Sequence, residues 1–414
     1  MDQNLSYILN TWFLLSSGCL VMLMAAGFAM LEAGMVRSRS VSVILAKNIS
    51  LYAVAGVIFY LIGHNLMFTD VTGNGGYFGT PGIYTMSPTE DQVTRGYADT
   101  AFWFFQMVFV ATAASIVSGA LAERIKLWPF MIFCGVLTGL IYPLTGSWTW
   151  GGGWLSSMGF KDFAGSTIVH TVGGWAALTG AILLGARRGR FVEVGKSKAP
   201  APSSMPLVTL GTFILWFGWF GFNGGSQLAI ASVDDAIAVA HILANTNMAA
   251  AGGVIAIMLA AGFSRRKLDL PLLLNGALAG LVSITAEPVT PTLGYAILIG
   301  AAGALIMYGA LKLLELAKID DVVGAVPVHL AAGIWGTLAV CLTNPEASLT
   351  TQLIGIGTIG GTVATLSLMT WGLMKATIGI RLHATHEEIG GDMAELGQRA
   401  YNIEHIPNDN VQAA

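Results

Sequence analysis

Long apolar runs, broken by short polar segments, follow one another along almost the whole chain. A helix needs about 20 mainly apolar residues to cross the hydrocarbon of a bilayer. Eleven runs meet this length, and the pattern therefore predicts an all-α, polytopic membrane protein. The expected spans cover about residues 6–34, 41–68, 98–121, 127–147, 163–187, 205–226, 239–263, 271–287, 294–316, 322–342 and 350–378.

Composition supports this prediction. The 414 residues are 54% hydrophobic and 10% charged, whereas a soluble domain carries about 25% charged residues. The formal net charge of -3 offers no basic surface for nucleic acid. The 52 glycines suit close packing of helices in lipid.

The distribution of Lys and Arg predicts how the chain is oriented. Loops on the cytoplasmic side of a membrane carry an excess of these residues. In the eleven-span arrangement only Arg95 and Lys161 lie on one side, so the 20 basic residues divide 18 to 2. We therefore expect a plasma-membrane protein with its N-terminus outside and its C-terminus in the cytoplasm.

Two segments in different halves of the chain repeat one pattern around a histidine. His170 comes eight residues after Asp162, and His329 comes eight residues after Asp321. A titratable side chain inside a membrane helix is costly and is a functional hypothesis by default. The segments also share glycines at 165/324 and 174/333 and valines at 169/328.

These segments begin the fifth and tenth spans, which predicts an inverted duplication. A repeat of five spans, about 6–187, must enter the membrane from the opposite side in its second copy, about 205–342. An extra span at about 350–378 completes a membrane domain over residues 1–378. Residues 187–204 would link the halves, and 379–414 would form a cytoplasmic tail whose last dozen residues are disordered.

The two histidines have a structural and a functional interpretation. Each alone is as well explained by helix packing as by function, but equivalent repeat positions favour function. Neutral imidazole offers one donor and one acceptor nitrogen, so His170 and His329 could line a narrow pore and relay a proton. A metal site would need further His, Cys, Asp or Glu ligands, and none lies within a turn of either histidine.

Aromatic residues recur at helical spacing in two spans and near the end of a third. Phe105 and Phe109 lie one turn apart, as do Phe222 and Ser226, and Trp150 follows the fourth span. Such residues alone are more often plain core. Together, ring faces and a hydroxyl could attract a small cation, an effect of about 2 kcal/mol when desolvated.

Carboxylates near span ends have mainly structural interpretations. Asp162 could be a substrate carboxylate, but its place at the start of a span favours a cap that accepts hydrogen bonds from free N–H groups. Asp321 would do the same in the second repeat. Glu32 and Glu287 are interpreted as helix-end contacts, although prolines after Glu287 suggest a broken helix there.

Seven motifs occur in a fixed order from the first span to the tail: GFAMLEAG (27–34), AER (122–124), WGGGW (150–154), DFAGSTIVH (162–170), WFGWFGFNGGS (216–226), DDVVGAVPVH (320–329) and AELGQRAY (394–401). With these motifs the chain resembles the ammonium transporter family (Amt/Mep/Rh), on its Amt side. The third to sixth motifs contain every aromatic and histidine singled out above except Phe105 and Phe109.

The resemblance implies a homotrimer with one pore in each protomer and no cofactor. Trp150, Phe109 and Ser226 would form an external recruitment site for ammonium, with methylammonium as an analogue. Phe109 and Phe222 would form an aromatic gate above the twin histidines. Asp162 would support the recruitment site, and Ala164 and Thr285 would lie near the path.

The resemblance also implies a regulatory tail and an alternative function. The family's tail docks onto the trimer and in bacteria works with PII-class signalling proteins. Here Leu396 and Gln398 replace the family's usual His and Glu, a departure that bears on regulation rather than on the pore. Some members act chiefly as ammonium sensors, which here would need a separate partner. No nucleophile–base arrangement or cofactor motif supports an enzyme.

A transport mechanism follows from this resemblance and from the cost of desolvating an ion. Moving a hydrated cation into a dry pore costs several kcal/mol. Ammonium avoids this cost by leaving a proton behind, which K⁺ cannot do. Ammonia would then cross the apolar pore while the imidazole pair carries the proton, so that transport is electrogenic.

Overall fold

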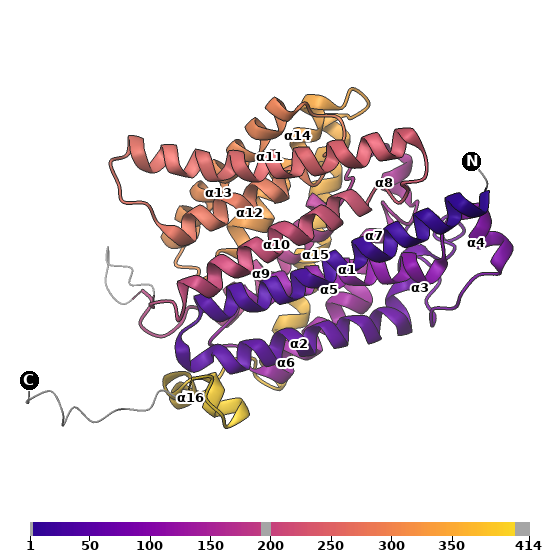
Figure 1. Ribbon diagram of the computed structural model, residues 1–414. Coiled ribbons are helices and arrows are strands. Elements are labelled where there is room, and N and C mark those ends of the chain that lie inside the picture. Colours follow the sequence, from indigo (N-terminus) through magenta and orange to yellow (C-terminus); the bar gives the residue numbers. More distant parts are fainter. Residues whose placement is uncertain (1–2, 192–199, 402–414) are drawn as a thin grey trace, which may run out of the picture.

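The computed structural model describes residues 3–191 and 200–401 and is built almost entirely of helices (Figure 1). The α-helices are α1 (Gln3–Met35), α2 (Val41–Ile58), α3 (His64–Phe68), α4 (Thr89–Arg95), α5 (Asp99–Ala120), α6 (Leu127–Val136), α7 (Tyr142–Ser147), α8 (Trp154–Ser157), α9 (Val172–Leu184), α10 (Met205–Gly225), α11 (Val233–Phe263), α12 (Leu270–Ile284), α13 (Leu293–Leu316), α14 (Ala332–Thr343), α15 (Leu349–Thr377) and α16 (Ala384–Ile389).

Shorter segments join several of these helices into longer rods. One is the 3₁₀ turn η1 (Ser38–Ser40), and the others are π-helical: η2 (Phe59–Gly63), η3 (Leu137–Ile141), η4 (Ser166–Thr171), η5 (Val326–Ala331) and η6 (Asp392–Leu396). Thus α2, η2 and α3 form one rod, and α6, η3 and α7 form another. In the described part of the chain, extended pairing is limited to one isolated bridge between Ile125 and Arg381.

The fold class predicted from the sequence is confirmed. Within the described ranges, ten helical segments are long and apolar enough to cross a membrane, and α12 adds a shorter apolar helix of 15 residues. This helix occupies the place of the predicted eighth span but ends at Ile284, before Glu287. The count of eleven spans and the orientation of the termini stay predictions.

The first helices of the two predicted repeats, α1 and α10, pack most extensively against each other (Figure 1). Their backbones approach closely because glycines face each other at the crossing. A Cβ added at Gly211 of α10 would lie 2.3 Å from the backbone nitrogen of Leu31 and 2.6 Å from the carbonyl oxygen of Gly27. Small residues of this kind permit tight helix contacts in membrane proteins.

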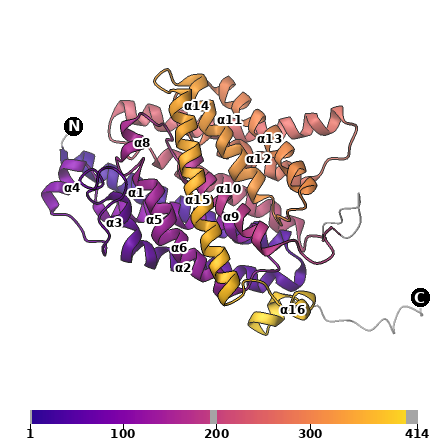
Figure 2. The same cartoon turned by 180° about the vertical axis from the view of Figure 1, so that it is seen from behind.

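The first turns of the fifth span in each predicted repeat meet in the middle of the bundle. The π-helical segments η4 and η5 contact each other, and each is continued by an α-helix, α9 or α14. The long helix α15 packs against α9 and runs obliquely across the outside of the bundle (Figure 2). This arrangement places His170 and His329 at the centre of the molecule.

The tail packs against the end of the bundle opposite the N-terminus, which we call the tail end (Figure 1). Asp392 accepts a hydrogen bond from the backbone N–H of Val43 at 2.8 Å, and Glu395 accepts one from that of Leu127 at 2.7 Å. These carboxylates therefore cap the first turns of α2 and α6, where free N–H groups favour negative charge. The last dozen residues, which were predicted to be disordered, and part of the 187–204 linker lie outside the described residues.

A buried ion-pair network closes the same end. Arg187 donates to Glu123 at 3.0 Å and makes a two-pronged contact with Asp320, with N–O distances of 2.8 and 2.9 Å. The network thereby ties the loop after α5 and the loop after α9 to the segment before η5. Burial alone would raise the pKa of Asp320, but the hydrogen bonds and charge of Arg187, with Arg124, lower it to about 2.

We predict that replacing Gly211 by Ala destabilises the protein, because the added methyl group collides with the α1 backbone. The matched control is Gly309→Ala in α13, where a Cβ meets nothing within 4 Å; this change should be neutral or stabilising by about 0.5–1 kcal/mol. Melting temperatures in detergent test the difference. Equal melting temperatures for the two variants would contradict the close crossing.

The Asp320 network predicts a pH dependence of stability. The folded pKa of about 2 lies below the ordinary value of 3.8. The carboxylate therefore contributes stability that is complete above about pH 4 and is lost as the pH falls towards 2, roughly 2 kcal/mol in all. In detergent, Asp320→Asn should be less stable at neutral pH and should lose less stability over that range. Parallel melting curves for the two proteins would refute this assignment.

Candidate functional site

The site begins with the two histidines, which touch at the centre of the bundle. The Nδ1 atoms of His170 and His329 lie 3.2 Å apart, within hydrogen-bonding distance, and the rings are inclined by 22°. Such a contact requires one ring to carry the Nδ1 proton and the other to accept it. Both side chains are buried. Within the described part of the chain, Nε2 of His170 has no hydrogen-bond partner.

Equivalent aspartates hold the two histidine segments. Asp162 accepts hydrogen bonds from the backbone N–H groups of Thr167 and Ile168 at 2.8 and 2.9 Å. Asp321 accepts one from Val326 at 2.7 Å. The geometry is that of a helix cap in both repeats.

The turn from each aspartate into its helix needs a glycine. Gly165 and Gly324 adopt φ angles of +107° and +81°, a region that residues with a Cβ rarely occupy. Each glycine N–H also donates to its own aspartate, at 3.2 and 3.0 Å. The two glycines shared by the repeats therefore have the same structural role.

Aromatic rings from α10 and α5 stack in series on one side of the histidines. Trp219 and Phe222 lie 5.0 and 5.4 Å from the ring of His170, measured between centroids. Phe222 in turn stacks on Phe109, with centroids 3.9 Å apart and planes inclined by 20°. The two phenylalanines separate the histidines from the end of the molecule that carries the N-terminus.

Beyond this stack lies a cavity of about 180 Å³, which we call the aromatic cavity. Its lining brings together Phe109, Trp150 and Ser226, the three residues that the family resemblance places in a recruitment site. The Ser226 hydroxyl donates to the carbonyl of Phe222 at 2.8 Å. The cavity is completed by Phe68, Phe102, Phe105, Gln106, Phe163 and Leu228.

Trp150 is fixed to the histidine segment through the backbone. Its indole N–H donates to the carbonyl oxygen of Asp162 at 2.9 Å. Burial raises the pKa of Asp162 to about 6, against the lowering effect of the backbone hydrogen bonds that the carboxylate accepts. Asp162 thus fixes the start of η4 with its carboxylate and the position of Trp150, in the wall of the aromatic cavity, with its carbonyl oxygen.

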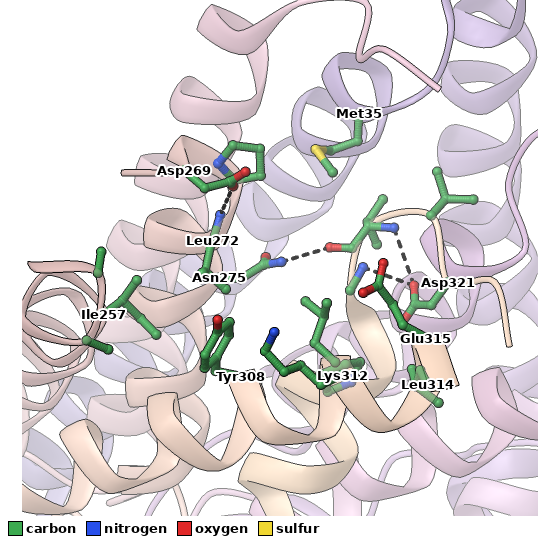
Figure 3. Close-up of a pocket in the computed structure, with 18 of the residues that line it drawn as sticks. Met35, Ile257, Asp269, Leu272, Asn275, Tyr308, Lys312, Leu314, Glu315 and Asp321 are labelled. Carbon is green, nitrogen blue, oxygen red and sulfur yellow. Dashed lines mark hydrogen bonds between the residues drawn. The ribbon is translucent and has the colours of Figure 1, made fainter. Parts of the chain in front are cut away.

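On the other side of the histidines lies the central cavity, of about 20 Å³. Its lining includes Glu32, Ser115 and His329. It shares Asn275 and Gly324 with a much larger cavity at the tail end, of about 470 Å³. Figure 3 shows this tail-end cavity, with Asn275 donating to a backbone carbonyl that belongs to Val323, at 3.1 Å. The two cavities and the aromatic cavity thus lie in series with the histidine pair.

Metal ligation finds no support in this geometry. Among the residues that the structure describes, no group of three or more His, Cys, Asp or Glu side chains lies close enough together to hold a metal ion. The histidine contact is instead surrounded by aromatic rings and aliphatic side chains. The arrangement is suited to a small molecule or a proton.

Comparison with known proteins decides the family. The model of the Ammonium Transporter Family matches residues 11–401. The chain belongs to the ammonium transporter family. It is 40% identical over 403 residues to a Synechocystis protein whose name places it among ammonium transporters, covering 96% of this chain and 90% of that one. It is 38% identical to ammonium transporter Amt2 of Archaeoglobus fulgidus, covering 93% and 86%.

Solved structures of family members share the fold. A structure named "Sensor Amt Protein" superposes with a TM-score of 0.88 at 32% identity, covering 95% of this chain and 99% of that one. Mep2 of Candida albicans gives a TM-score of 0.82 at 27% identity, covering 93% and 89%. This member of the ammonium transporter family is therefore a multi-pass membrane protein, and the resemblance drawn from its motifs is confirmed.

Two residues of this family member were not assigned to the site from the sequence. Trp219 stacks on His170 and donates to the hydroxyl of Thr285 at 2.8 Å. A signal for it existed, since it lies three residues before Phe222 on the same face of α10. Glu32 was interpreted as a helix-end contact, but it lines the central cavity with His329, a placement that no local pattern reveals.

We predict that Asp162→Ala lowers stability in detergent more than Asp162→Asn does. The alanine leaves three backbone N–H groups without their acceptor, at roughly 1–3 kcal/mol for each buried group, whereas asparagine keeps one acceptor oxygen. Asp91→Ala on the exposed helix α4 is the control and should change little. An Asp162→Ala protein as stable as this control would show that the cap contributes nothing.

Proposed function

We propose that this protein transports ammonium across the membrane. The observation that carries the proposal is the histidine contact at 3.2 Å, set in series between an aromatic cavity and a tail-end cavity. Membership of a family whose relatives are named ammonium transporters supports the same substrate. Methylammonium is the natural analogue for measuring uptake.

Ammonium would first collect in the aromatic cavity. The rings of Phe109 and Trp150 attract a cation. The hydroxyl oxygen of Ser226 can accept a hydrogen bond from one N–H group of the ammonium ion. Gln106 lines the same cavity and has a buried carbonyl oxygen with no protein partner in the described residues. The cavity thus suits a small cation that donates hydrogen bonds in several directions.

The Phe109–Phe222 stack would act as a gate between this cavity and the histidines. The two rings leave no polar group to replace the hydration shell of an ion, so a bare cation would pass at a cost of several kcal/mol. Ammonium can lose a proton and continue as neutral ammonia, whereas K⁺ keeps its charge. The stack would therefore select by acidity as well as by size.

The histidine pair would carry the proton. A proton that reaches Nε2 of His170 can leave through the shared Nδ1 contact, because the Nδ1 proton then passes to His329. Ammonia and the proton pass the histidines separately and recombine on the tail-end side of the pair. Net movement of NH₄⁺ would then be electrogenic.

The surroundings of this pore are proposed from the family and the charge pattern. We place the protein in the plasma membrane as a homotrimer in contact with lipid, with one pore in each protomer, its N-terminus outside and its tail in the cytoplasm. The membrane domain would end at about residue 378, with repeats at about 6–187 and 205–342 and an extra span at about 350–378. The tail, 379–414, would be the contact for a PII-class regulatory protein.

The first test is the current of proteoliposomes after an ammonium pulse. The wild-type protein should give a saturable current with ammonium and none with K⁺. The double variant that combines His170→Ala and His329→Ala should reduce that current at least tenfold, because the proton loses its carrier. His241→Ala is the control. Among the described residues, its ring hydrogen-bonds the backbone carbonyl of Pro291, and it lines none of the three cavities in the proposed path. An undiminished current in the double variant would refute the proton-relay mechanism.

A sensor is the second candidate function. It is favoured by one observation, the likeness over 95% of this chain to the structure named "Sensor Amt Protein". A sensor would bind ammonium in the aromatic cavity and signal through the docked tail to a separate partner. Ammonium binding without current in the reconstituted wild-type protein would support the sensor, and a saturable current would support the transporter.

A further inference from the structure

Glu32 is a buried carboxylate beside the histidine pair that the transport mechanism leaves without a role. It lies on α1 inside the bundle and is only 1% exposed. Its Oε2 accepts hydrogen bonds from Asn48 of α2 at 2.8 Å and from Ser118 of α5 at 2.7 Å. Its Oε1 is buried and has no hydrogen-bond partner among the described residues. An unpartnered carboxylate oxygen in a protein interior calls for an explanation.

The carboxylate shares a cavity with the second histidine. Phe28 and Glu32 lie one turn apart on α1 and both line the central cavity, and the Phe28 ring lies 6.1 Å from that of His329. The cavity volume of about 20 Å³ is enough for one water molecule. The cavity that His329 and Glu32 both line therefore has room for a water that could carry a proton between them.

A buried ammonium group compensates the charge of Glu32 through a shared residue. Lys47 donates to the carbonyl oxygen of Ser118 at 2.7 Å, while the hydroxyl of the same serine donates to Glu32. Lys47 also lies 4.8 Å from the ring centre of Phe130. Burying an uncompensated charge would be expensive, so this pairing allows Glu32 to be ionised beside the pore. The link through Ser118 reaches only Oε2 of the carboxylate, and Oε1 keeps no hydrogen-bond partner among the described residues.

We propose that Glu32 is the proton acceptor for the tail-end half of the pore. This inference rests on the proposed transport of ammonium and adds a residue to it. The proton leaves the His329 imidazolium, crosses one water and binds Oε1 of Glu32. Ammonia that has passed the histidines takes the proton from the carboxylic acid. NH₄⁺ is thereby restored, the carboxylate is regenerated, and the ion leaves past Asn275 into the tail-end cavity.

The charge relation to Lys47 determines the design of the test. Glu32→Gln keeps the volume and one acceptor oxygen for Asn48 and Ser118 but removes the proton-accepting charge. Alone, it leaves Lys47 uncompensated, so Glu32→Gln is also combined with Lys47→Met, which keeps the length of the side chain and restores neutrality. Glu32→Asp keeps the carboxylate and the charge pair. Melting temperature in detergent identifies the variants that fold.

Two readouts on proteoliposomes separate the proton path from the ammonia path: current after an ammonium pulse, and alkalinisation of the lumen above protein-free vesicles. In Glu32→Gln and in the charge-balanced double variant, the current should fall at least tenfold while protein-dependent alkalinisation remains. Glu32→Asp keeps a carboxylate and should retain a current within tenfold of the wild-type value. If the neutral variants do not fold, the current of Glu32→Asp decides the question.

Several outcomes would overturn the proposal. Wild-type current in Glu32→Gln would show that the carboxylate is not needed, and recovery of current in the double variant would reduce Glu32 to a counter-charge for Lys47. Loss of both current and alkalinisation in Glu32→Gln would indicate a blocked pore. Loss of current in Glu32→Asp would show that a carboxylate at this position does not sustain the proton path. A wild-type protein without ammonium current would instead refute the proposed function itself.

Discussion

The contact between His170 and His329 is the constraint on which the rest of the structure depends. Two polar rings at the centre of a membrane protein can be buried only if each finds a partner, because an unpaired polar group in a dry interior costs about 1–3 kcal/mol or more. Here each ring supplies the partner of the other, at 3.2 Å. Both segments that carry them must therefore be held to within a fraction of an ångström.

The surrounding backbone meets that requirement with the same device twice. An aspartate caps the start of η4 and of η5, and a glycine with positive φ turns the chain from the aspartate into the helix. Both histidines lie in π-helical turns, which are rare and occur frequently at functional sites. The wider turn leaves irregular hydrogen bonding, which is tolerated at membrane depth only where protein surrounds it. The helices packed around η4 and η5 provide that enclosure.

Much of this could be predicted from the sequence, and the reasons for the exceptions are physical. The histidine pair followed from equal spacing after Asp162 and Asp321, because a repeated sequence gives a repeated local structure. The π-helical turns could not be predicted, since apolar residues with period 3.6 do not distinguish an α-turn from a π-turn. The place of Glu32 in the central cavity could not be predicted, because its partners, Asn48 and Ser118, belong to other helices and the pairing exists only in the folded bundle.

The early end of α12 has a cause of the same kind. The backbone after Ile284 pairs with the residues that lead into η4, where the N–H of Ala164 donates to the carbonyl of Thr285 at 3.0 Å. This pairing joins segments more than a hundred residues apart, so the apolar run that predicted a longer span carries no sign of it.

The scaffold is repeated, but the side chains at its two mouths are not. Aromatic rings line one end, whereas Glu32 and Asn275 lie towards the other. This asymmetry cannot set the direction of flow, because a pore without an energy source only moves its substrate down a gradient. The asymmetry can decide whether transport follows the concentration gradient of ammonia alone or also the membrane potential. If ammonia crossed alone, its concentrations would simply equalise. If the proton crosses as well, each ion moves one charge through the membrane potential, about 2.3 kcal/mol for 100 mV, which corresponds to roughly fifty-fold accumulation. A continuous proton path from His170 through His329 to an acceptor beyond it is therefore what separates a concentrating transporter from a gas channel.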